Sequence, residues 1–411
     1  MTHQNSIRQP MPKVLWALLF GNFVIGTGVM IVPGTLSVIS QSLRIPVATA
    51  GQLISAGALL MCIGAPLFAT VVAGWDRRKL LVLSMLWYAA LHALCALMPD
   101  FASLLVVRVL TMISPAIFTP QAAACVGLLV SENQRGRAIT FVFLGWSVAS
   151  VVGMPVGAYL GGSLGWQSAF LLVAALSLIS AAWVWQAMPN GVKPPALSRA
   201  AWALTLKSPA LMTCILVTTL YAAGQFVLFA YLSPYFKTKF DISPLQLSTL
   251  FMWMGGLGLL GNIWMSRNVD RLGAQRMVWM GICGMILSLL IWPFGTTLLL
   301  AAVVIAPWAI SIFATNSAQQ ARLVGFAPAL ASASVSLNTS AMYAGQAIGT
   351  AIGGLLISAD RMSELHLYGL ALLVLALAGS LWASLMSKKN QSYRKLKNHW
   401  IKLLLSLTAS R

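Results

Sequence analysis

Gly153-Met-Pro-Val-Gly157, followed by Gly161 and Gly162, returns later in the chain as Gly345-Gln-Ala-Ile-Gly349, followed by Gly353 and Gly354. Each glycine of the second stretch stands 192 residues after its counterpart, as 345 minus 153 gives. Glycines at four-residue spacing share one face of a helix and let two helix backbones approach closely. The repeat therefore predicts a chain made of two related halves.

The composition places both halves in lipid. Of the 411 residues, 59% are hydrophobic and 8% are charged, whereas soluble proteins carry roughly 25% charged residues. A bilayer core takes about 20 apolar residues per helix. The apolar runs predict an all-α membrane protein with twelve transmembrane helices in two pseudo-symmetric six-helix bundles, an arrangement typical of transporters. The predicted spans are 14–40, 47–73, 80–98, 101–130, 136–163, 166–188, 209–236, 244–266, 276–294, 297–324, 328–358 and 365–386.

The net charge of +19 indicates topology rather than a nucleic-acid surface. If the N-terminus is cytoplasmic, the outer loops hold only Arg44, Lys237, Lys239 and Arg361 among the 26 lysines and arginines. Apart from Arg108, which lies inside a span, the others lie in inner loops and tails, as the positive-inside rule requires. We therefore expect a multi-pass protein of a bacterial inner (cytoplasmic) membrane with both termini in the cytoplasm, and no secretory peptide ahead of the first span.

The chain divides at its Pro-rich and polar midpoint. Residues 1–188 are expected to form the N-terminal bundle, 189–208 a cytoplasmic linker and 209–387 the C-terminal bundle. Within the linker, Arg199–Leu206 suits a short helix on the membrane surface. The basic tail 388–411 suits either contact with anionic lipid or a solvated segment.

The sequence lacks the residue patterns of common enzymes. No acidic pair within a span, no metal-ligand spacing and no triad suggests catalysis, and no Gly-rich Lys-Ser/Thr loop suggests ATP use. We expect no enzyme activity, no cofactor and no metal. The cysteines are interpreted as packing residues within spans: Cys62, Cys95, Cys125, Cys214 and Cys283.

The segment from Arg108 to Phe170 carries a series of motifs: Arg108, Pro120, Arg135-Gly-Arg137, the first glycine run and Gly165-Trp-Gln-Ser-Ala-Phe170. With them the chain resembles the major facilitator superfamily, specifically its bacterial drug and sugar exporters of the arabinose-efflux type (the drug:proton antiporter group with twelve spans). The resemblance covers essentially the whole chain and is more specific in the first half. It implies the major facilitator fold, efflux by alternating access, proton coupling and a monomer.

Two charged loops recur in the halves. Asp76-Arg77-Arg78 follows the second span, and Asp270-Arg271 follows the eighth. The resemblance implies a conformational latch here, in which the carboxylate meets a helix N-terminus of the other half. Glu132 and Arg137, after the fourth span, are further implied members. The alternative is that all of these residues only set topology.

The glycine runs have two compatible interpretations. In the family, the first copy is similar to a signature of exporters, while ordinary close packing explains both copies. Pro155 limits internal hydrogen bonding and permits a bend. The predicted helix-packing residues are Gly153, Pro155, Gly157, Gly161, Gly345, Gly349 and Gly353.

Arg108 lies about 10 Å from the outer end of the fourth span at 1.5 Å per residue. Intramembrane cations are costly and usually functional, and the resemblance implies proton coupling or substrate binding. The alternative is an arginine that snorkels to the membrane surface. His92, on the peripheral third span, is interpreted as a packing residue.

A candidate substrate cavity follows from the resemblance, which places spans one, four, seven and ten around it. All seven acids lie at loops or helix ends, and Val29 stands where related exporters often carry an acid, so the residues lend proton antiport no support of their own. The uncharged polar set favours neutral or mildly polar solutes, although each member also suits interhelical hydrogen bonding. The cavity candidates, eleventh span included, are Asn22, Arg108, Thr119, Gln121, Tyr221, Gln225, Asn316, Asn338, Tyr343 and Gln346.

The leading prediction is a secondary active exporter of small neutral or mildly polar, amphiphilic solutes (a drug or a sugar). An importer or an uncoupled facilitator of the same fold is the first alternative. A membrane sensor that moves no solute is the alternative from a different class. Expected partners are the solute, the lipid bilayer and protons, with no nucleic acid.

Overall fold

The computed structural model describes residues 13–72, 74–193, 199–327 and 330–385, with the backbone alone at 69, 127, 132–137, 199–201, 270 and 331–332. All regular secondary structure in these ranges is helical, and eleven of the helices are long and apolar enough to cross a membrane. The helix Ala274–Leu290 is apolar but shorter, and it occupies the place of the ninth predicted span. The predicted all-α membrane fold is confirmed.

The helices follow the predicted spans within a few residues, and several spans consist of two or three consecutive helices. The largest difference is in the eighth span, which continues to Leu272. The first half contains α1 Lys13–Ser42, α2 Val47–Ala50, α3 Gln52–Val71, α4 Arg77–Leu97, α5 Phe101–Thr111, α6 Ile113–Leu129, α7 Glu132–Val148, η1 Ala149–Gly153, α8 Met154–Leu164 and α9 Trp166–Ala187. After the short helix α10 Arg199–Leu206, the second half contains α11 Pro209–Phe229, α12 Leu232–Phe240, α13 Pro244–Leu272, α14 Ala274–Leu290, η2 Trp292–Phe294, α15 Leu298–Phe326, α16 Ala331–Ser358, η4 Met362–Glu364 and a last helix over 365–385.

Local chemistry sets many of the helix ends. The carboxylates of Asp76 and Asp100 accept the backbone N–H three residues on, at 3.1 and 2.9 Å, and so begin α4 and α5. Ser243 begins α13 with a reciprocal capping box. Gly165 and Gly273 link consecutive helices at φ +91° and +83°, a conformation that glycine adopts without steric cost.

The outer surface of the helices is apolar. Leu97, Leu299 and Leu355 are 74%, 76% and 72% exposed, and many other large aliphatic side chains share this surface. A soluble monomer rarely exposes such contiguous apolar area. The exposed face therefore suits lipid, and the chain is a multi-pass membrane protein.

The two glycine runs pack against matching helices in the two halves. A Cβ atom on Gly153, Gly157 or Gly161 would meet the side chain of Thr27, Ile31 or Thr35 on α1. A Cβ atom on Gly345, Gly349 or Gly353 would meet the backbone oxygen of Thr219, Ala223 or Val227 on α11. Because the α11 partners also stand 192 residues after those on α1, as 219 minus 27 gives, the duplication includes both surfaces of the contact. Immediately before Pro155 the helix makes a π-helical turn, η1.

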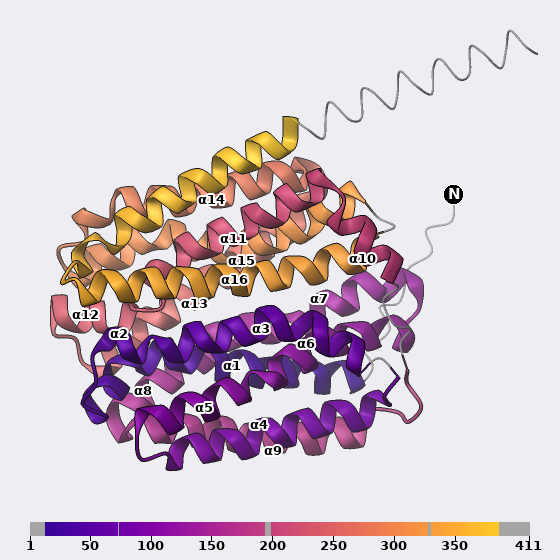
Figure 1. Cartoon of the computed structure of the whole chain (residues 1–411), viewed down its shortest axis with the longest axis horizontal. Helices are drawn as coiled ribbons and strands as arrows, with labels where there is room; N and C mark the ends of the chain where they lie inside the picture. Colours follow the sequence, from indigo (N-terminus) through magenta and orange to yellow (C-terminus); the bar gives the residue numbers. More distant parts are fainter. Residues whose placement is uncertain (1–12, 73, 194–198, 328–329, 386–411) are drawn as a thin grey trace, which may run out of the picture.

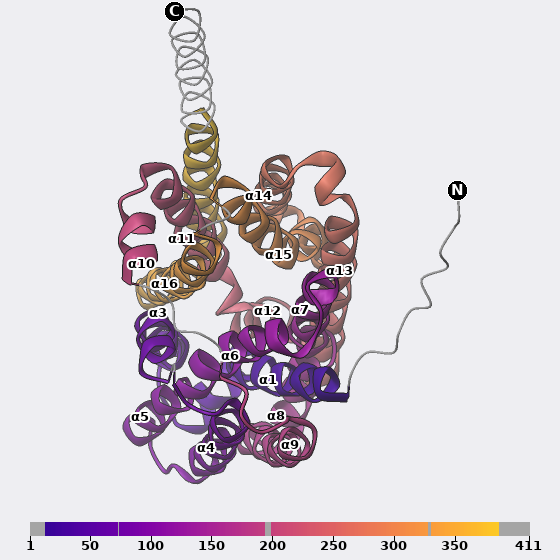
Figure 2. The same ribbon diagram turned by 90° about the vertical axis from the view of Figure 1, so that its right-hand side faces the viewer.

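The halves lie side by side with their helices roughly parallel to one axis (Figure 1). Figure 2 looks along the helices and shows α3 beside α16, and α13 beside α7. We call the end where α1 begins and residues 189–193 lie the linker end, and the other the opposite end. Among the described residues, three hydrogen bonds cross between the halves in the part nearer the opposite end: Ser37 Oγ with Ser233 Oγ at 3.0 Å, Lys237 Nζ to Gln41 Oε1 at 3.1 Å, and Ser248 Oγ to Pro155 O at 2.9 Å. The halves are therefore closed together toward the opposite end.

Candidate substrate cavity and its arginine

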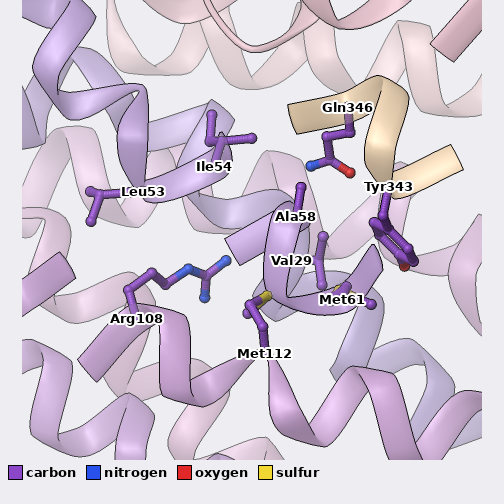
Figure 3. A pocket seen from close by; sticks show the side chains of 9 residues that line it. All are labelled: Val29, Leu53, Ile54, Ala58, Met61, Arg108, Met112, Tyr343 and Gln346. Carbon is purple, nitrogen blue, oxygen red and sulfur yellow. The ribbon is translucent and has the colours of Figure 1, made fainter. Parts of the chain in front are cut away.

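A small cavity lies between the halves, where α3 of the first half meets α16 of the second (Figure 3). Its volume is about 10 Å³, roughly the space that one water molecule needs. The structure therefore holds the site in a nearly closed form. The lining residues are Val29, Leu53, Ile54, Ala58, Met61, Arg108, Met112, Tyr343 and Gln346.

Arg108 is the charged member of this lining. It is 2% exposed, and Figure 3 shows its guanidinium pointing from α5 into the space between the helices. Its Nη2 donates to the backbone oxygen of Gly28 on α1 at 2.9 Å, and its guanidinium lies 5.9 Å from the Phe170 ring centre. The side chain is thus held inward by α1 and α9, and it does not snorkel toward the opposite end.

His92 is the second partner of Arg108. Its Nδ1 lies 2.9 Å from the backbone oxygen of Tyr88, and its Nε2 lies 3.4 Å from Arg108 Nη1. Because a carbonyl oxygen only accepts, Nδ1 carries the hydrogen, which leaves Nε2 as the acceptor for the arginine. His92 is fully buried on α4, and the interpretation of this residue as packing alone misses its contact with Arg108.

Gly28 makes room for this cluster. A Cβ atom there would lie 2.3 Å from the Tyr88 hydroxyl and 2.9 Å from His92 Nε2. The Tyr88 hydroxyl donates to Ile25 O on α1 at 3.2 Å. The absence of a side chain at residue 28 therefore lets α4 and Arg108 reach the α1 backbone.

Most of the other cavity candidates are bonded to one another between helices. In the first half, Thr119 Oγ1 donates to Asn22 Oδ1 at 2.9 Å. In the second half, Asn316 Oδ1 accepts from the Tyr221 hydroxyl and from Asn338 Nδ2, each at 3.3 Å. These bonds agree with the alternative of interhelical hydrogen bonding, and these five residues are not in the cavity lining.

Of the four remaining candidates, two line the cavity and two do not. Tyr343 and Gln346 line the cavity together with Arg108. Gln121 and Gln225 are buried at 5% and 2% exposure but lie outside the lining. In this closed form the lining comes from spans one, two, four and eleven, and the expected cavity around spans one, four, seven and ten stays a prediction.

Sequence reasoning missed the largest contribution to the lining, which comes from α3. Leu53, Ile54, Ala58 and Met61 supply it, and nothing distinguishes them from the lipid-facing aliphatic residues of the same helix. Met112, which ends α5 and precedes α6, adds a flexible thioether. Such side chains give an adaptable apolar surface.

The first charged loop is bound to its own half and to the linker. Asp76 accepts from the backbone N–H of Lys79 and, at 2.6 Å, from that of Gly191 in the linker. Arg78 donates to Asn190 Oδ1 at 3.0 Å and stacks 4.1 Å above the Trp185 ring, while Arg77 Nη1 donates to Val72 O and Trp75 O. Asp76 therefore meets the N-terminus of α4 and not, as the resemblance implied, a helix of the other half.

The other latch candidates add little in this structure. Arg271 is exposed, and the side chains of Glu132, Arg137 and Asp270 lie outside the description. Burial of the Asp76 carboxylate raises its pKa, but the backbone N–H groups of Lys79, Gly191 and Arg78 outweigh this effect and hold the pKa below its usual value.

Arg322 is a second buried cation. The topology argument placed it in an inner loop, but it lies within α15 and is 2% exposed. Its Nη1 donates to Ser380 Oγ at 2.8 Å, and its Nη2 donates to Ser380 O at 3.0 Å and Ser384 Oγ at 3.2 Å. The last helix thus supplies neutral acceptors to this charge. Among the described residues no group of three His, Cys, Asp or Glu side chains is placed to hold a metal ion.

The fold and cavity agree with a comparison against known families. The model of the Major Facilitator Superfamily matches residues 18–350. The chain belongs to this superfamily. Its members are membrane transporters, so the match also gives the general activity of the chain.

Individual relatives refine this picture. The chain is 28% identical over 348 residues to the inner membrane transport protein YdhP of Escherichia coli O157:H7, which covers 84% of this chain and 89% of the relative. It is 33% identical over 272 residues to a chloramphenicol resistance protein of Streptomyces lividans, covering 64% and 69%. A bacterial homologue of the human lysosomal transporter Spinster, solved inward-facing and unoccupied, shares the fold at a TM-score of 0.74 and 18% identity over 92% of this chain and 97% of that one.

Proposed function

We propose that this superfamily member exports small amphiphilic solutes across a bacterial inner membrane by alternating access, with the linker end in the cytoplasm and proton entry as the driving force. The observation that carries the proposal is the position of the cavity. Residues of both halves line it, with Arg108 from the first half and Tyr343 and Gln346 from the second. A rocking motion of the halves would therefore open and close it.

The hydrogen bonds that close the halves together toward the opposite end support this mechanism. The bonds Ser37–Ser233 and Lys237–Gln41 join the halves between the cavity and the opposite end. Solute release toward that end requires them to break. One is a neutral bond and the other is exposed, and each contributes about 0.5–1.5 kcal/mol of stability. Their loss therefore adds little to the free energy of a transition between states.

The proposed direction and location rest on two features. The cations of the described loops gather at the linker end, and positive loops stay in the cytoplasm. The relative from Streptomyces lividans is named for chloramphenicol resistance, and resistance by a transporter is a property of efflux. The largely aliphatic cavity lining suits solutes with an apolar body.

Transport in everted membrane vesicles tests direction and coupling together. The panel contains chloramphenicol, a sugar, a nucleoside, an amino acid and amphiphilic carboxylates, and a dye reports the pH gradient. We expect uptake of at least one panel member into everted vesicles, with collapse of the gradient. Uptake only into right-side-out vesicles would reject export, and uptake that survives a protonophore would reject proton coupling.

A reversible crosslink tests alternating access. Ser37→Cys and Ser233→Cys together place two thiols where the hydroxyl oxygens are 3.0 Å apart. In a background with the five native cysteines replaced, oxidation should lock the opposite end closed and stop transport, and reduction should restore it. The single variants Ser37→Cys and Ser233→Cys are the controls. Full transport by the crosslinked protein would contradict the mechanism.

A further inference from the structure

The partners of Arg108 are all uncharged. They are the Gly28 carbonyl oxygen, the neutral Nε2 of His92, the Tyr88 hydroxyl and the Phe170 ring. Its Nε has no hydrogen-bond partner among the described residues. An arginine stays protonated in proteins, so the cavity wall carries a full positive charge.

Among the described side chains, no acid is placed to neutralise that charge. Six of the seven acids, Asp76, Asp100, Asp241, Asp360, Glu132 and Glu364, lie before or after helices or in their first turns, and Asp270 lies in the last turn of α13. Within the described part of the chain the one salt bridge joins Arg361 and Glu364. Val29, which shares the cavity with Arg108, offers only an aliphatic side chain.

An unneutralised buried cation has an energetic consequence. Desolvation of a charge in a protein interior costs several kcal/mol unless an opposite charge and hydrogen bonds offset it. Membrane proteins keep such groups mainly where they act on ions or solutes. A negative charge from outside the chain would complete this site.

The other lining residues indicate which kind of ligand would carry that negative charge. Leu53, Ile54, Met61 and Met112 form an apolar wall, and Gln346 adds an amide from the other half. We propose that the cavity binds amphiphilic organic anions, with a carboxylate on the Arg108 guanidinium and an apolar body against α3 and Met112. This inference rests on the proposed function and replaces the expectation of neutral solutes with a defined charge. A cationic solute would meet repulsion at the same place.

Matched probes test the charge preference in the full-length protein purified in detergent. The probes are 4-phenylbutyrate and octanoate, each compared with its primary amide and its amine, and melting curves over a concentration series give apparent affinities. Because a charge-assisted bond exceeds a neutral one, the carboxylates should bind at least about tenfold more tightly than their amides. In Arg108→Gln the two affinities should become equal, and Arg108→Lys should retain part of the preference.

Equal effects of carboxylate, amide and amine, or no effect of any of them, would overturn the proposal. So would a carboxylate preference that survives in Arg108→Gln. Because these measurements need no transport, they separate this proposal from the proposed function. A protein that prefers carboxylates but moves none of them in vesicles would retain the anion site and lose the export assignment.

A second test needs no ligand. Val29→Glu places a carboxylate in the same cavity as Arg108, and Val29→Gln is the matched uncharged control. The Glu variant should melt at a higher temperature than the Gln variant, and this difference should vanish when Arg108→Gln is added. The built-in carboxylate should also abolish the preference for carboxylate probes. A Glu variant no more stable than the Gln variant would show that the arginine needs no counter-charge, and the proposal would fall.

Discussion

His92 Nε2 lies 3.4 Å from Arg108 Nη1 and accepts its hydrogen bond, because Nδ1 of the same ring donates to Tyr88 O. The imidazole thereby directs the guanidinium toward the cavity and leaves its charge unneutralised. His92 is a positioning residue, since it does not line the cavity itself.

His92→Leu should therefore weaken the binding of carboxylates several-fold through loss of a hydrogen bond worth about 1 kcal/mol, while the binding of amides stays the same. His92→Gln keeps an acceptor oxygen and should recover most of the affinity. The measurement is the ratio of carboxylate to amide affinity in each variant, with the melting temperature as the check on folding. Equal ratios in wild type and His92→Leu would limit His92 to packing.

The glycine repeat makes a graded prediction about stability. A Cβ atom at Gly349 would lie 2.2 Å from the backbone oxygen of Ala223, whereas at Gly157 it would lie 2.7 Å from the Ile31 methyl group. A backbone oxygen cannot rotate away as a side chain can, so Gly349→Ala should cost more than Gly157→Ala, about 1–3 kcal/mol or more for overpacking.

Gly256→Ala is the control for the glycine series, because no atom lies within 4 Å of the added methyl group. It should leave the protein as stable as wild type or slightly more stable, since alanine is the better helix former. Thermal melting of the three variants in detergent gives the order. Equal losses at residues 349 and 256 would contradict the close contact between α16 and α11.

The fold was largely accessible from the sequence, and the reasons are local. Lipid requires apolar runs of helix length, so the spans are visible directly, and the repeat of Gly153 and Gly345 marks surfaces that the structure brings against α1 and α11. The N-caps that Asp76 and Asp100 provide were not predicted.

The site was accessible only in part. Arg108 stands out because a charge in an apolar span is rare. Its contact with His92 depends on how closely α4 and α5 approach α1 at Gly28, which no pattern in the sequence encodes. Leu53 and Met61 cannot be distinguished from lipid-facing residues of the same type. Arg322 was placed in a loop because a cation at the end of a span usually marks one, whereas the hydroxyls of Ser380 and Ser384 keep it buried.

Asp76 and Asp100 form a matched pair for testing the latch. Both cap a helix through the backbone N–H three residues on, so Asp76→Ala and Asp100→Ala should each destabilise the protein through the loss of an N-cap. If Asp76 has only this role, the two variants will lose transport equally. A latch predicts that Asp76→Ala alone changes the accessibility of a cysteine at the cavity.

The contribution of Asp76 to the free energy of unfolding should change with pH in a defined direction. The pKa of Asp76 is lowered in the folded protein, so its contribution to stability is fully present above the unfolded value of about 3.9. This contribution is lost as the pH falls through the lower folded pKa. The stability difference between wild type and Asp76→Ala should therefore be constant from pH 5 to 8 and should narrow only below about pH 4.

Ser380 supports one buried and one partly buried donor at once, because its Oγ accepts from Arg322 Nη1 at 2.8 Å and from Trp279 Nε1 at 3.1 Å. Ser380→Ala leaves both without this acceptor and should cost about 1–3 kcal/mol per orphaned group. Ser384→Ala should cost less stability, because Arg322 Nη2 loses the Ser384 hydroxyl but still donates to Ser380 O.

The double variant Ser380→Ala with Arg322→Met removes the charge as well as its acceptor. It should be more stable than Ser380→Ala alone, because an apolar side chain needs no partner in this site. Melting curves of the three variants decide the matter: a double variant less stable than Ser380→Ala would mean that Arg322 contributes through its packing and not through these hydrogen bonds.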